Sequence, residues 1–123
     1  SDLVLEVKKY FIEELSKLDD VIINSKLEDH FIPYILSVSF KGVKGEVLLH
    51  SLEAKGIYVS TGSACSSKNH KSSEILKALG RSLEEQGGTI RFSFSECNNK
   101  DEIDYVIIEL NKSLKFLRKM NKR

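Results

Sequence analysis

The residue best suited to covalent chemistry is Cys65, which stands in the stretch STGSACSS from Ser60 to Ser67. Its neighbours are small and mostly polar, so they offer little that could fill a hydrophobic core. Lys68, His70 and Lys71 follow just beyond the thiol. Nearby positive charge lowers the pKa of a thiol and favours the thiolate, which is the nucleophilic form. Two interpretations stay open: a reactive thiol on a loop, or an inert small side chain, as most free cysteines are.

A second candidate is Arg91, inside the segment TIRFSF. Alternation of apolar and polar residues predicts a β-strand with Ile90, Phe92 and Phe94 on one face. Arg91 then points to the opposite face, together with Thr89. A guanidinium held on a rigid strand suits bidentate binding of a carboxylate. The alternative is a surface arginine that pairs with an acidic side chain.

The other cysteine and the remaining histidines give weaker indications. Cys97 follows the same strand beside two asparagines, and we interpret it as an inert thiol. His50 falls on the surface of a predicted helix, and His30 falls in a loop. Lys71 lies among polar and charged residues, whereas a Schiff-base lysine needs a buried site. The cysteines and histidines show no paired ligand spacing, so no metal site is expected.

Composition and charge exclude several classes of protein. The chain has 123 residues, 41% hydrophobic and 30% charged, with a formal net charge of +1. This favours one ordinary globular domain with no strong attraction to nucleic acid or to a membrane surface. The basic C-terminal run is interpreted as favourable charge at a helix end. No apolar run approaches the ~20 residues that span a bilayer. Two cysteines make no disulfide framework, which indicates a reducing, cytosolic setting.

Hydrophobic periodicity and turn residues predict the order α-β-β-α-β-α-β-α. The last helix is preceded by a predicted capping box of Asn99 and Glu102. This order predicts a single domain over residues 1–123, built as a two-layer α/β sandwich with helices packed on about four strands. The predicted strands are Val21 to Ile23, Ile35 to Phe40, Ile57 to Val59 and Thr89 to Phe94. The predicted helices lie over 3–18, about 47–55, about 75–79 and 100 onward, with Gly56 and Gly80 as helix stops.

With these residues in place, the sequence resembles the C-terminal small domain of a cysteine desulfurase of the class V aminotransferase superfamily, a fold type I pyridoxal-phosphate enzyme. The resemblance covers essentially the whole chain and is tightest from Val43 to Ile107. The STGSAC element resembles the subgroup with the longer cysteine loop. The matching stretches are GVKGEVLLHSLEAKGIYVSTGSACSS, SSEILKALG, GTIRFSFS and DEIDYVI.

The resemblance implies a reaction and a division of labour. Such enzymes convert L-cysteine to L-alanine. Cys65 matches the cysteine that takes the sulfur as a persulfide and delivers it to acceptor or scaffold proteins, for iron–sulfur cluster assembly or for thiolation of tRNA or cofactors. Arg91 matches the arginine that binds the substrate carboxylate. The full-length enzyme is expected to be a cytoplasmic homodimer, whose large domain holds pyridoxal phosphate and is absent from this chain.

It follows that the isolated domain is expected to bind no pyridoxal phosphate and to be inactive. Two departures from the family concern loop dynamics and partner choice: Ser72-Ser73-Glu74 stands where Pro-Ser-His is common, and Ser95-Glu96-Cys97 where Gly-Arg-aromatic is common. Two alternatives remain, namely a stand-alone binding module or a persulfide carrier. Reactivity of Cys65 separates them, because an inert thiol favours the binding module.

Overall fold

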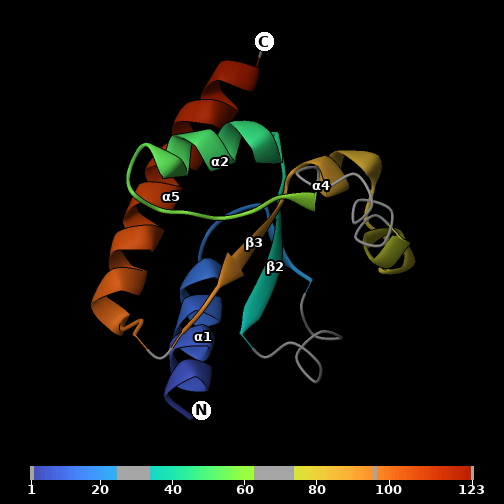
Figure 1. Ribbon diagram of the computed structural model, residues 1–123. Coiled ribbons are helices and arrows are strands. Elements are labelled where there is room, and N and C mark those ends of the chain that lie inside the picture. Colours follow the sequence, from blue (N-terminus) through green and yellow to red (C-terminus); the bar gives the residue numbers. More distant parts are fainter. Residues whose placement is uncertain (1, 25–33, 63–73, 96, 123) are drawn as a thin grey trace.

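The computed structural model describes residues 2–24, 34–62, 74–95 and 97–122. Within these ranges the helices and strands follow the predicted order, except that the predicted strand at 57–59 is absent and α4 is an additional helix (Figure 1). The helices are α1 (Asp2–Leu15), α2 (Gly45–Glu53), α4 (Leu83–Gly87) and α5 (Lys100–Asn121), with further helical residues at 74–78. The strands are β1 (Val21–Ile23), β2 (Ile35–Phe40) and β3 (Thr89–Ser93). None of the helices in these ranges has both the length and the apolar character that a membrane span requires.

The described strands form an antiparallel sheet in the order β1-β2-β3, so β2 lies in the middle. Helix α5 packs against both α1 and α2, and α2 also contacts β3. Figure 1 shows α5 running beside α1, with α2 across the upper part of the sheet and α4 on the other side of β3. The predicted sandwich of helices on a small sheet is therefore confirmed.

The apolar face of β3 lies at the centre of the core. Ile90 is fully buried and Phe92 is 5% exposed. Phe11 of α1 packs edge-on against Phe92, with ring centroids 4.8 Å apart, and against Phe94 at 5.6 Å. Phe40 of β2 also packs edge-on against Phe92, with ring centroids 6.3 Å apart. Edge-to-face rings add to the free energy gained from burial alone, so this aromatic cluster joins α1 to the sheet.

The prediction of a strand over Ile57 to Val59 is wrong, because these residues form no strand in the structure. The N–H of Ile57 donates to the carbonyl of Leu52 (3.0 Å) and so completes the end of α2, where Gly56 adopts a positive φ of 79°. In the described segment that follows α2, only Ser60 pairs with β3, through a single bridge to Arg91. The described sheet therefore has three strands instead of about four, and the 57–59 segment crosses beside the end of β3 (Figure 1).

The helix ends follow local sequence signals. Asn99 and Glu102 form the predicted capping box at the start of α5, and Ser82 and Glu85 form a second one at α4. The predicted stop at Gly80 is confirmed by its φ of 84°. Helix α1 ends at Leu15, three residues before the predicted end, in a turn that leads into β1.

The end of α5 is held by Arg118. Its Nε donates to the carbonyl of Lys41 (2.8 Å), and its two terminal nitrogens donate to the carbonyls of Asp19 (3.0 Å) and Asp20 (2.9 Å). One guanidinium thus joins the α1–β1 turn, the β2–α2 turn and the last turns of α5. Charged donors make stronger hydrogen bonds than neutral ones.

Phe11→Ala is expected to lower the free energy of unfolding by about 3–5 kcal/mol, because it removes the ring that joins α1 to the sheet. Leu5→Ala on the same helix is the matched control, since Leu5 is 51% exposed. That control should change stability by no more than about 0.5 kcal/mol. Urea unfolding measures both values. Equal losses in the two variants would contradict the packing described for Phe11.

Tyr10 of α1 is expected to ionise unusually late. Its hydroxyl donates a short hydrogen bond to Oδ1 of Asp104 on α5, and this contact raises the pKa of Tyr10 from 10.0 to about 12. Because the raised pKa belongs to the folded state, the stabilisation is complete below pH 10 and is lost as the pH rises toward 12. Near-ultraviolet titration should show the transition return toward pH 10 in Asp104→Asn. A Tyr10 transition that is the same in both proteins would count against the contact.

Candidate functional site

Arg91 lies on β3, on the sheet face opposite the aromatic core. The exposure alternates along the strand: Ile90 and Phe92 are buried, Thr89 and Arg91 are half-buried, and Ser93 is exposed. The predicted orientation of Arg91 is therefore confirmed. Its partner across the β2–β3 pair is Ser37, which is 6% exposed. The guanidinium thus belongs to a polar face of the sheet.

The stretch that contains Cys65 begins directly beside Arg91. The N–H of Ser60 donates to the carbonyl of Arg91 (3.1 Å), and the N–H of Arg91 donates back to the carbonyl of Ser60 (2.8 Å). Cys65, Lys68 and the other residues of 63–73 lie outside the described residues.

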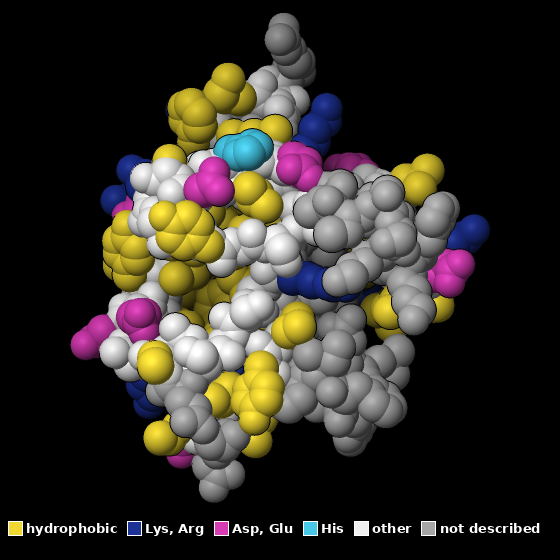
Figure 2. All heavy atoms as spheres, in the orientation of Figure 1, with side chains coloured by type: hydrophobic (Ala, Val, Ile, Leu, Met, Phe, Trp, Pro, Cys, Tyr) yellow, Lys and Arg dark blue, Asp and Glu magenta, His cyan; other side chains and the backbone are white. Residues whose placement is uncertain are grey.

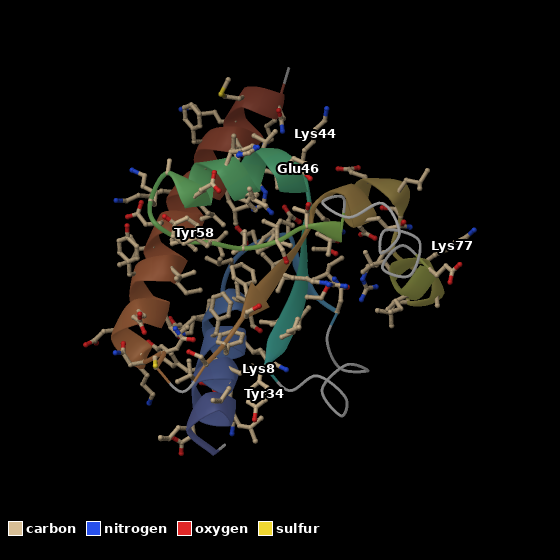
Figure 3. The ribbon with its side chains drawn as sticks, viewed as in Figure 1. Lys8, Tyr34, Lys44, Glu46, Tyr58 and Lys77 are labelled. Carbon is tan, nitrogen blue, oxygen red and sulfur yellow. The ribbon has the colours of Figure 1, made fainter. Side chains whose placement is uncertain are left out.

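Two further contacts fix the point where this stretch leaves the sheet. Oγ1 of Thr61 donates to Oε1 of Glu46 in the first turn of α2 (2.8 Å). Gly45 lets that turn approach closely, because an added Cβ would lie 3.0 Å from the carbonyl oxygen of Thr89 and 3.5 Å from Cγ2 of Thr61. Figure 3 shows Glu46 at the end of α2 that faces the start of β3. Ser60 and Thr61 are thus anchored to β3 and to α2.

The remaining polar candidates show ordinary surroundings. Cys97 is an exposed free thiol. His50 is an exposed residue of α2, with Nδ1 3.6 Å from Oε1 of Glu53. His30 and His70 lie outside the described residues. Over the described ranges, no three His, Cys, Asp or Glu side chains form a group that could bind a metal ion.

Two hollows open on the described surface. One, of about 380 Å³, lies between the 56–59 segment, β3 and the start of α5, and its walls include Phe92, Tyr58 and Tyr105. Figure 2 shows it as a recess with a hydrophobic floor. The other, of about 520 Å³, lies at the end of α5, and half of its lining residues are basic, among them Lys115 and Lys119. Arg91 lines neither hollow.

The model of the aminotransferase class-V family matches residues 3–106. The chain therefore belongs to the class-V aminotransferase family. It is 41% identical over 107 residues to the cysteine desulfurase IscS of Photorhabdus laumondii, a match that covers 87% of this chain and 26% of the relative. It is 38% identical over 120 residues to the IscS of Vibrio atlanticus, covering 98% of this chain and 29% of the relative.

Solved structures agree with this assignment. A NifS-like protein superposes with a TM-score of 0.73 at 29% identity, covering 94% of this chain and 28% of that chain. A NifS-like protein from Rickettsia africae shares the fold, with a TM-score of 0.73 at 20% identity, covering 92% of this chain and 28% of that chain. The chain thus spans less than a third of the length of these relatives.

The family implies pyridoxal phosphate, but the described residues do not fit a site for it. The cofactor forms a Schiff base with a lysine that a protected site must activate. Lys8 is buried (4% exposed) but lines neither hollow described above. Lys115 and Lys119, which line the α5 hollow, are exposed to solvent. No step involving the cofactor is therefore assigned to the described residues.

The sequence predicted the orientation of Arg91 but not the contacts that surround its strand. Ser37 and Ser39 share one face of β2, and the alternation of their strand was the signal for them. Thr61 and Glu46 stand 15 residues apart, and no local pattern relates them.

Proposed function

We propose that this chain is the small, C-terminal domain of a cysteine desulfurase, which converts L-cysteine to L-alanine and carries the sulfur on Cys65. The observation that carries the proposal is the backbone pairing of Ser60 with Arg91. It brings the start of the cysteine stretch to the candidate carboxylate-binding residue. The similarity to IscS proteins along nearly the whole chain supports the same assignment.

Arg91 would hold the substrate by its carboxylate. A guanidinium presents parallel N–H donors that match the two carboxylate oxygens, and this geometry fixes the orientation of the substrate as well as its affinity. The strand supplies rigidity, because both backbone edges at Arg91 are paired, one with β2 and one with Ser60.

Cys65 would accept the sulfur. Its thiolate forms a new S–S bond with the substrate sulfur while the substrate C–S bond breaks. The electron pair of the broken bond stays on carbon, which takes a proton to become the methyl group of L-alanine. Pyridoxal phosphate, bound by the remainder of the enzyme, supplies the electron sink that makes this cleavage possible. The basic residues after Cys65 favour the attacking thiolate.

The remaining assignments concern the whole enzyme. We propose a cytoplasmic homodimer in which a large domain outside this chain binds the cofactor. The persulfide of Cys65 would pass to an acceptor or scaffold protein, for iron–sulfur cluster assembly or for thiolation of tRNA or cofactors. In this scheme the domain itself does not contact nucleic acid or membrane.

Cys65→Ala in the complete enzyme is expected to abolish persulfide and sulfide formation while substrate binding persists, because the thiol acts after the substrate is in place. Cys97→Ala is the matched control and should keep the wild-type rate. Alanine and sulfide are measured separately, and the persulfide is located by mass spectrometry. Full sulfur transfer by Cys65→Ala would refute the assignment of Cys65 as the sulfur acceptor. A Cys65 thiol no more reactive than Cys97 toward an alkylating reagent would favour the binding module.

Arg91→Ala is expected to raise the KM for L-cysteine about ten- to more than a hundredfold, since a hydrogen bond to a charged group contributes about 1.5–3 kcal/mol. Arg91→Lys should recover only part of this loss, because lysine keeps the charge but loses the planar fork. The melting temperature should stay nearly constant, since the side chain points away from the core. A lower melting temperature with unchanged substrate binding would show that Arg91 is structural.

A further inference from the structure

Four hydrogen bonds cross the polar face of the sheet in one continuous line. Three join two side chains, and the last joins a side chain to a backbone carbonyl. Nε of Arg81 donates to Oδ1 of Asn24 (2.6 Å), and Nδ2 of Asn24 donates to Oγ of Ser39 (2.8 Å). Oγ of Ser39 lies 2.6 Å from Oγ1 of Thr89, which in turn donates to the carbonyl of Glu85 (2.8 Å). The line starts at Arg81, just ahead of α4, passes Asn24 after β1, Ser39 of β2 and Thr89 of β3, and returns to α4 at Glu85.

The direction of every proton in this line is determined. A carbonyl oxygen only accepts, so the hydroxyl proton of Thr89 is committed to Glu85. Thr89 must then accept from Ser39, which makes Ser39 the donor of the 2.6 Å contact. Ser39 is thereby left to accept from the amide of Asn24. A line of bonds with one direction polarises each member and strengthens the whole.

The middle of this line is deeply buried, while Arg81 and Thr89 on either side are half-buried. Asn24 is 4% exposed and Ser39 is 0% exposed. A buried polar group that loses its partner costs more than an ordinary hydrogen bond contributes, so the line tolerates little displacement of the strands that carry it. The same amide of Asn24 also reaches Oγ of Ser37 at 3.4 Å, and Ser37 is the cross-strand partner of Arg91.

Arg91 is the functional residue nearest to the end of this line. Thr89 precedes it by two residues, so both side chains lie on the same face of β3. Bidentate recognition of a carboxylate requires the guanidinium to be held within about 0.5 Å of its working position. The line fixes β3 against β2 on one side of Arg91, and the Ser60 pairing fixes its other edge.

We propose that Asn24, Ser39 and Thr89 are positioning residues that hold Arg91 in place for the carboxylate of the substrate; the inference rests on the proposed function of Arg91. Thr89→Val in the complete enzyme keeps the shape of the side chain but removes both the donor and the acceptor. It is expected to raise the KM for L-cysteine about tenfold with kcat unchanged. Thr89→Ser keeps the hydroxyl and should restore the wild-type KM.

Two readouts separate positioning from general loss of stability. The first is the ratio of inhibition constants for S-methyl-L-cysteine and for its decarboxylated analogue, 2-(methylthio)ethylamine. Thr89→Val should lower this preference for the carboxylate by the same factor of about ten, whereas a structural effect weakens both inhibitors equally. The second is amide hydrogen exchange at Arg91, followed on the N–H groups of its neighbours Ile90 and Phe92, which pair with β2. This exchange should become faster, and it does not depend on activity.

Ser113→Ala is the matched control. Ser113 is 7% exposed and its hydroxyl lies 2.7 Å from that of Ser51, in a comparable pair between α2 and α5. It should lower the melting temperature without changing the inhibitor ratio or the exchange at Arg91. Ser39→Ala, which removes one oxygen from the middle of the line, must reproduce the effects of Thr89→Val and replaces it if that variant does not fold.

An unchanged inhibitor ratio in Thr89→Val and Ser39→Ala would overturn the inference, as would equal changes in Ser113→Ala. Exchange at Arg91 then identifies which assumption failed. Faster exchange with an unchanged ratio means that Arg91 is not the carboxylate ligand, which refutes that part of the proposed function. Unchanged exchange means that the line does not hold Arg91.

Discussion

The register between β2 and β3 is the constraint on which the rest of the structure depends. Side chains alternate along a strand, so a slip of one residue would turn Arg91 toward the core and expose Ile90 and Phe92. Gly88 fixes this register at the start of β3. Its carbonyl accepts from the N–H of Phe40 (2.9 Å), and an added Cβ would lie 2.3 Å from the carbonyl oxygen of Phe40. Only glycine fits this approach.

Once the register is fixed, the two faces of one short strand serve different purposes. The apolar face joins α1 to the sheet through Phe11 and Phe92. The polar face holds Arg91 and the line of hydrogen bonds that passes through Thr89 to α4. Because both faces belong to the same five residues of β3, the packing of the core directly determines where the guanidinium stands. Among the described residues, α1 packs on the apolar face and α2 contacts Thr61 through Glu46.

Local patterns predicted those parts of the fold that local physics decides. The alternation in β3, the glycine at position 80 and the capping box of Asn99 are properties of a few neighbouring residues, and all were predicted correctly. The segment 57–59 has β-branched residues and was predicted as a strand, but the end of α2 uses the N–H of Ile57. That choice depends on where the preceding helix stops relative to β3, which periodicity does not specify. The polar line was missed for the same reason, since Asn24 and Arg81 stand 57 residues apart.

The three hydrogen bonds that Arg118 donates can form only late in synthesis on the ribosome. The three carbonyl acceptors precede Arg118 by 77 to 99 residues. At about 5–20 residues per second, synthesis exposes those carbonyls about 4 to 20 seconds before the guanidinium that binds them is made. The first helix also waits for α5, its packing partner. The side of α1 that packs against α5 therefore stays uncovered during this interval.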